Sequence, residues 1–247
     1  MSFLKSPKLW AYLVLAASVL CIGTIFYAIT GVRAGWESIT FGSASALIAK
    51  AMAYGRWISL LAAIALIYAF IKKQKLSQAI STLALLLVLV PVSINYATLP
   101  EPNDGPRAPP LNDISTDTQN PPLFSAVASI RPEGSNTLTY PANGPELQAQ
   151  AFPDIKPISS TLSKDEAFNR ALDVVDDMGW ELVAEDSSTG LIEAVSSTRV
   201  FSFEDDVVIR VAASGSGSIV DIRSHSRIGR GDRGVNAARV HSFISAF

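Results

Sequence analysis

Residues 205–229 read DDVVIRVAASGSGSIVDIRSHSRIG, and this stretch decides the fold of the C-terminal half of the chain. The glycine-serine run at 214–217 predicts a hairpin turn between strands at about 206–213 and 218–228. Side chains alternate between the two faces of a strand, so the apolar residues of each strand share one face. We assign to that face Val207, Ile209, Val211, Val220, Ile222 and Ile228.

The segments on either side complete an α+β domain. Ser163 and Glu166 form a capping box ahead of a helical apolar stripe that stops at Gly179. Two further strands are expected at about 180–185 and 191–198, and a last helix at about 232–247. We therefore predict a domain at 158–247 in which two helices pack on one face of a four-stranded antiparallel sheet.

The other face of this sheet is polar and has two interpretations. It is either a solvated surface with weak cross-strand charge pairs, or a surface that binds an anion or a partner and is lined by the preceding segment. Its charged residues are Glu193, Arg210, Asp221, Arg223, His225 and Arg227.

A glycine-rich turn follows the last strand. Gly229–Gly234 matches G-x-G-x-x-G, but too few residues follow for the return strand of a dinucleotide site. Free N–H groups at the start of a helix attract a phosphate or lipid headgroup, unless Asp232 caps the helix itself. The candidate ligand-binding residues are Arg210, Arg223, His225, Arg227, Gly229, Arg230, Gly231 and Asn236.

Residues 98–157 hold 12 of the 14 prolines, which excludes a helix or a central strand there. A disordered linker is one interpretation. The stretch is also rich in large apolar residues, which favours an extended arm lying over the following domain. Within it, residues 112–117 predict nested side-chain-to-backbone turns. The residues expected to face a partner are Asn112, Asp113, Thr116, Asp117, Phe152, Pro153 and Asp154.

Residues 1–97 form a predicted region of three transmembrane helices. Leu9–Thr30 carries no charge and is long enough to cross a bilayer, which favours a retained helix over a cleaved signal peptide. Leu76–Tyr96 is a third apolar run. The second, Trp57–Ile71, is short and must begin near Lys50 or earlier. That start places Arg56 inside the membrane edge, where it either snorkels to the headgroups or pairs with Glu37 or a lipid phosphate.

Lysines flank the first span and fill the loop at 72–75, so both places belong on the cytoplasmic side. The topology that satisfies both has a cytoplasmic N-terminus, three spans and a C-terminal domain outside. In a bacterium this is an inner-membrane protein with a periplasmic domain.

The composition excludes several classes of function. A net charge of −2 argues against nucleic-acid binding. Cys21 is the only cysteine, and the chain has two histidines, so no metal site is expected. Ser224 and Ser226 point away from His225 on one strand, which is unlike a catalytic triad. We predict no catalytic residue and no cofactor.

Several phrases resemble the domain-of-unknown-function family 1499, a group of uncharacterised bacterial envelope proteins. They lie within a stretch from about Pro110 to Phe247, and three leading membrane helices are a common arrangement in that family. The resemblance implies an envelope protein and carries no activity. The phrases are Leu111–Asp117, Ala151–Ile155, Met178–Glu181, Asp205–Val211 and Asp221–Gly229.

Three functional hypotheses remain open from the sequence. The preferred one is a non-enzymatic binding or accessory subunit that contacts membrane lipids and presents its domain to other membrane or periplasmic proteins of an envelope complex. The second is a module that binds an anionic ligand or lipid headgroup. The third is an enzyme that uses the polar sheet face.

Overall fold

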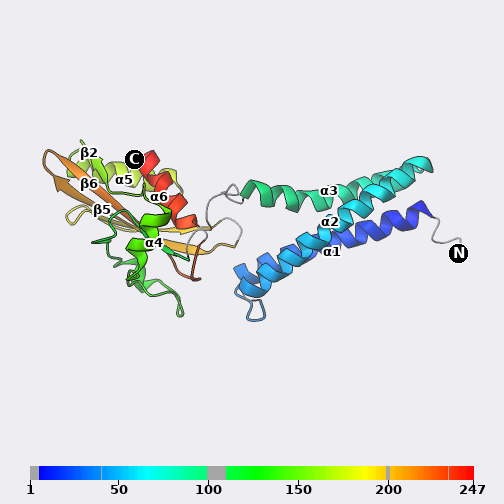
Figure 1. Cartoon of the computed structure of the whole chain (residues 1–247), viewed down its shortest axis with the longest axis horizontal. Coiled ribbons are helices and arrows are strands. Elements are labelled where there is room, and N and C mark those ends of the chain that lie inside the picture. The colour runs from blue at the N-terminus through cyan, green and yellow to red at the C-terminus, as the bar shows by residue number, and fades with distance from the viewer. Residues whose placement is uncertain (1–5, 40, 99–109, 199–200, 233) are drawn as a thin grey trace. The chain divides into compact units, whose positions relative to one another are not determined.

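A computed structural model describes residues 6–39, 41–98, 110–198, 201–232 and 234–247 (Figure 1). The chain divides into two compact units, Met1–Asp104 and Gly105–Phe247. The described residues of the N-terminal unit form three helices and their short connections, and the C-terminal unit is a mixed α+β fold with an antiparallel sheet.

Three helices that pack against one another form the N-terminal unit: α1 (Pro7–Arg33), α2 (Phe41–Ile71) and α3 (Lys75–Thr98). Their buried positions recur at steps of three and four residues, the spacing of a left-handed helical bundle. On α2 these positions are small, which lets the helix axes approach closely. They are Ala44, Ala51, Gly55, Ala62, Ala65 and Ala69. A second small-residue stripe on α2, which includes Ala46, Ala49 and Ala53, is exposed instead.

Two of these helices are long and apolar enough to cross a membrane, α1 and the Ala46–Ile71 part of α2. The sequence predicts three spans. In the third helix, α3, the segment Lys75–Leu89 qualifies only as a shorter apolar helix. The second span was expected to begin near Lys50 or earlier, and this is confirmed, because α2 continues back to Phe41.

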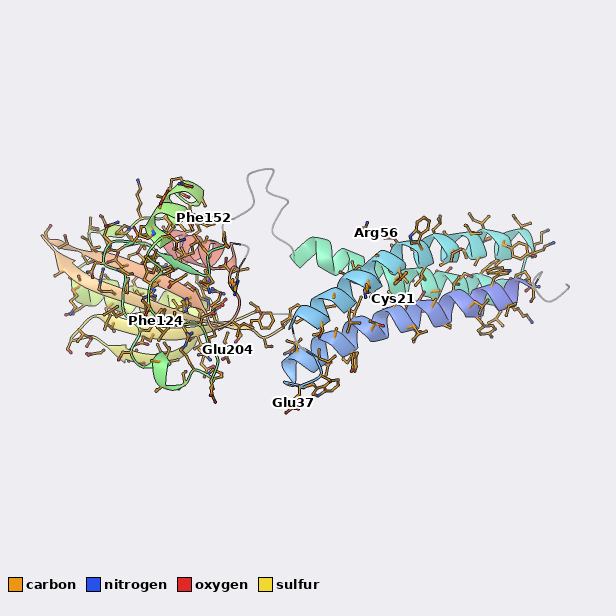
Figure 2. The ribbon with its side chains drawn as sticks, turned by 60° about the horizontal axis from the view of Figure 1, so that its bottom comes forward. Cys21, Glu37, Arg56, Phe124, Phe152 and Glu204 are labelled. Carbon is orange, nitrogen blue, oxygen red and sulfur yellow. The ribbon has the colours of Figure 1, made fainter. Side chains whose placement is uncertain are left out.

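The pairing of Arg56 with Glu37 is wrong. Glu37 lies in the connection between α1 and α2, at one end of the bundle, whereas Arg56 lies midway along α2 (Figure 2). Arg56 is 15 residues past Phe41, about 22 Å along a helix.

The C-terminal unit is built on a six-stranded antiparallel sheet rather than the predicted four. The four expected strands are β3 (Glu181–Asp186), β4 (Leu191–Ser197), β5 (Glu204–Ser214) and β6 (Gly217–Ser226). Two short strands, β1 (Asp113–Ser115) and β2 (Ile158–Ser160), pair with the free edge of β6. The predicted turns at 112–117 are therefore wrong at β1, because its backbone groups bond to that edge.

The predicted helices are found, with two corrections. α5 (Lys164–Asp177) begins with the expected capping box. α6 (Val235–Ala246) begins three residues after the predicted start at about residue 232, because Gly234 has φ 89°, outside the helical region. The proline-rich segment was expected to exclude helices, yet it contains α4 (Gly144–Ala151) and a 3-10 turn, η2 (Val127–Ser129). Proline is tolerated in α4 because Pro145 stands in its first turn.

One apolar core lies between the sheet and the helices α5 and α6. Residues 110–157, called the arm below, contribute Leu111, Ile114 and Ile155 to it, each at most 5% exposed. A disordered linker is therefore the wrong interpretation for these residues. The remainder of the predicted arm, 99–109, lies outside the described residues.

Candidate functional site

The sheet face opposite α5 and α6 is polar and buried, because the arm covers it. We call it the covered face. The interpretation as a solvated face is wrong, since five of the six charged residues predicted there are at most 5% exposed: Glu193, Asp221, Arg223, His225 and Arg227. Buried charges require partners, and most of these partners come from the arm.

Arg223 is held almost entirely by the arm. Its Nε and Nη2 donate to the two carboxylate oxygens of Asp113 at 2.9 and 2.7 Å. Its guanidinium lies 4.8 Å from the Phe124 ring centroid and 5.1 Å from that of Tyr140. It also donates to the backbone carbonyls of Pro122 and Leu138. A single side chain of β6 thus contacts three separate parts of the arm, at residues 113, 122–124 and 138–140.

His225 lies beside this pair. Asp113 on β1 and Asp206 on β5 are its partners in the strand register. Its Nδ1 is 3.4 Å from Asp113 Oδ2, and neither ring nitrogen has a hydrogen-bond partner. Burial lowers the pKa of His225, against the opposing effect of the Asp113 carboxylate. The imidazole is therefore held neutral inside a group of charges.

Asp206 and Glu193 hold two more parts of the arm. Asp206 is fully buried and pairs with Arg131 of the arm and with Arg227, which directly follows β6. The Glu193 carboxylate accepts the backbone N–H groups of residues 125, 126 and 127 at 2.9–3.0 Å, where η2 begins. A carboxylate at the N-terminus of a helical turn satisfies N–H groups that would otherwise be unpaired.

Arg210 lies at the more open end of the covered face. It pairs with Asp117 of the arm at 3.0 Å and with Asp221 at 2.7 Å, and about a quarter of its side chain is exposed. Thr116 donates to Asp221 and accepts the Ile222 N–H. Three of the predicted partner-facing residues, Asp113, Thr116 and Asp117, therefore point inward to the sheet.

The glycine turn is occupied by the chain itself. The carboxylate of Asp232 accepts from the Gly234 and Asn236 N–H groups at the start of α6. Burial raises the pKa of Asp232, against the lowering by these N–H groups. Asn112 and Asn136 both donate to the Gly229 carbonyl.

Other predicted residues are spread around this turn. Gly231 packs against Pro110, and Arg230 is exposed. Asn236 bonds to Ser224 and Ser226 behind the sheet. Phe152 is half-buried against the core and Pro153 is exposed. Asp154 is also exposed, 3.4 Å from His241. The two predicted sets therefore meet only in part, mainly where Asp113 pairs with Arg223.

Sequence reasoning missed Arg131, Asp206, Tyr140 and Gln148. Gln148 bonds to both the N–H and the C=O of Ser115, as a strand partner would. The available signal for Arg131 was that it is the only arginine between residues 110 and 157. Its partner lies 75 residues away, which local patterns cannot show.

Most charged groups of the covered face are bonded to the arm or to one another. In the part of the chain that the structure describes, no group of three His, Cys, Asp or Glu residues could hold a metal ion. Ser224 and Ser226 bond to Asn236 on the side of the sheet away from His225. The charges of the covered face serve to order the arm.

The sequence profile of a family described as a protein of unknown function (DUF1499) matches residues 113–247. This range begins at β1 and ends with α6, so it includes most of the arm as well as the sheet. No curated protein matches the chain.

Proposed function

The chain belongs to the DUF1499 family, and from this premise we propose that it is a non-enzymatic binding or accessory subunit anchored in a membrane. Three helices hold it in the bacterial inner membrane, with the N-terminus in the cytoplasm. The C-terminal unit is then periplasmic and is presented to other proteins of an envelope complex.

The rigid presentation of the arm carries this proposal. Its inner side is fastened to the sheet through Arg223 and Glu193, whereas Leu123 and Ile130 on either side of η2 are 74% and 51% exposed. Large apolar side chains on an ordered segment lose little conformational entropy on association. Such side chains are typical anchors of protein interfaces.

The lysines support the orientation. α2 ends at Ile71 and α3 begins at Lys75, so Lys72 and Lys73 occupy a short connection at one end of the bundle. Lys8 lies in the first turn of α1. Clusters of lysine in short loops remain on the cytoplasmic side.

Single-cysteine labelling tests the topology. In a Cys21→Ala background, Ser129→Cys is expected to react with a membrane-impermeant maleimide in spheroplasts. Lys72→Cys is expected to react only after the membrane is permeabilised. Both residues are exposed. The reverse pattern would exclude a periplasmic domain.

Purification from native membranes in a mild detergent tests the binding role. The wild-type chain and a Leu182→Asp control, changed at an exposed position on β3, are expected to retain the same partner protein. The double variant Leu123→Asp/Ile130→Asp should retain at least tenfold less. A chain that always elutes alone, or a double variant that keeps its partner, contradicts the proposal.

A further inference from the structure

We propose that α2 docks a transmembrane helix of a different membrane protein, and that Arg56 pairs there with an intramembrane carboxylate of that helix. The inference deepens the proposed function and rests on its membrane insertion. It names a second contact, within the bilayer, and the chemistry of the partner.

The depth of Arg56 follows from the contacts of the residues next to it. Cys21 of α1 donates to the Ala51 carbonyl of α2 at 3.1 Å. A Cβ at Gly55 would lie 3.5 Å from the Cys21 sulfur and 3.3 Å from Val88 of α3. Cys21, Gly55 and Val88 therefore lie at the same height along the three-helix bundle. Arg56 directly follows Gly55.

That level is the middle of the bilayer. Cys21 is 12 residues from Leu9 and 9 from Thr30, and Val88 is 12 from Leu76 and 8 from Tyr96. At the rise of an α-helix, each is about 12 to 18 Å from both ends of its apolar run. The stem of an arginine is too short to carry its guanidinium across that distance to the headgroups. Snorkelling therefore does not satisfy Arg56.

Arg56 does not face the interior of its own bundle. Its side chain is exposed, and so is that of the next residue, Trp57, at 68%. Figure 2 shows Arg56 on the outside of α2, midway along the bundle. A charged residue at mid-membrane is costly and almost always points to a protein interior or pairs with another polar group. The exposed position of Arg56 therefore indicates that a polar group of another protein lies beside it in the membrane.

The surface around Arg56 has the shape of a helix contact. Exposed residues on this side of α2 recur at steps of three and four, as on its buried side, and a shallow hollow lies beside Arg56 along Ala53, Trp57 and Leu60. A small residue flanked by large ones admits a neighbouring helix closely. The recurring positions are Lys50, Ala53, Trp57, Leu60, Ile64, Ile67 and Ile71.

The positive charge of Arg56 indicates which kind of helix binds to this side of α2. The sequences of α1, α2 and α3 contain no Asp or Glu. A second copy of this chain therefore has no carboxylate to offer at that depth. A helix of another protein with an Asp or Glu near its centre satisfies the guanidinium with charge-assisted hydrogen bonds.

Photocrosslinking of the full chain in native membranes tests the inference. A photoreactive amino acid replaces Leu60 in the hollow, or Leu20 as a control. Leu20 is 71% exposed on α1, one residue from the level of Cys21. The Leu60 probe is expected to capture one membrane protein through an apolar helix that contains Asp or Glu, and the Leu20 probe to capture lipid. Arg56→Leu should reduce the adduct at least tenfold, and Arg56→Asp with the captured carboxylate changed to Arg should restore it.

Carbonate extraction of the same membranes separates the two proposals. Extraction of the chain contradicts membrane insertion, and with it the proposed anchoring. If the chain is retained, three results overturn the further inference alone. They are an adduct with lipid or a second copy only, an adduct with a helix that lacks a carboxylate, and an Arg56→Leu adduct of unchanged yield.

Discussion

Removal of the Asp113 carboxylate should detach the arm from the sheet. Asp113 and Arg223 are at most 1% exposed, and Asp113→Ala deletes two short charge-assisted hydrogen bonds. Arg223 would then remain buried with only the carbonyls of Pro122 and Leu138 as hydrogen-bond acceptors. Breaking a buried pair from one side costs about 3–5 kcal/mol.

Hydrogen exchange at the bonds that join the arm to β6 measures this loss. The Thr116 amide donates to the Ile222 carbonyl at 3.0 Å, and the Asn136 amide to that of Arg227 at 2.7 Å. Since about 1.4 kcal/mol is a factor of ten, the protection of both amides should fall by about 150-fold to 5,000-fold in Asp113→Ala.

Two further variants make the test specific. Asp117→Asn removes the charge that pairs with Arg210 but keeps an oxygen that can accept the Gln119 and Asn120 N–H groups, and both side chains of the pair are about a quarter exposed, so less than about 1 kcal/mol should be lost. Asp113→Ala with Arg223→Met removes both charges and should recover more than half of the protection. A fall of less than about fivefold in Asp113→Ala, about 1 kcal/mol, would refute the view that this pair holds the arm.

Three other predictions concern His225, Glu193 and Gly55. Because the pKa of His225 is lowered in the folded chain, its contribution to stability is complete above its unfolded pKa of about 6.5 and is lost as the pH falls towards the folded value. Urea unfolding should show this slope in the wild type and a weaker one in His225→Phe; equal slopes would contradict it. Glu193→Ala leaves three N–H groups unpaired and should weaken η2 by at least about 1–3 kcal/mol, seen as faster exchange of the Val127 amide. An unchanged rate would rule out the capping role. Gly55→Leu should lower the thermal midpoint of the detergent-solubilised bundle, at a cost of about 1–3 kcal/mol, since even a Cβ would touch Val88 at 3.3 Å. Ala53→Leu, at an exposed position, serves as its control and should leave the midpoint unchanged.

Local patterns account for the parts of the fold that were predicted correctly. Ser163 and Glu166 are three residues apart and satisfy each other's backbone N–H groups, so the start of α5 could be predicted without any distant contact. The strand pair β5 and β6 follows from a glycine turn and a two-residue alternation. The polar face was identified by the same alternation.

The burial of that face could not be predicted. Alternation shows that Arg223 and His225 share a side, but not whether water or protein lies over them. The Asp113 that pairs with Arg223 is 110 residues away in sequence. Similarly, the sequence shows that Arg56 directly precedes the apolar run Trp57–Ile71, and only the contacts around Gly55 show which residues of α1 and α3 lie beside it.

Periodicity in the sequence was enough to predict the apolar helices, α5, α6 and the four strands β3 to β6, and the side of the sheet on which most residues of β5 and β6 lie. These features are set by periodicity and by bonds between near neighbours. Ile228 is an exception, because it was assigned to the apolar face but lies beyond the end of β6 and is 45% exposed. Tertiary contacts show that β1 of the arm and the following strand β2 pair with β6, and that the arm buries the covered face. The pairs that close it join residues such as Arg131 and Asp206, whose proximity exists only once the chain has folded. Charged side chains that the arm buries, such as Arg223, have fixed partners. The exposed Arg56 has no charged partner inside the described chain.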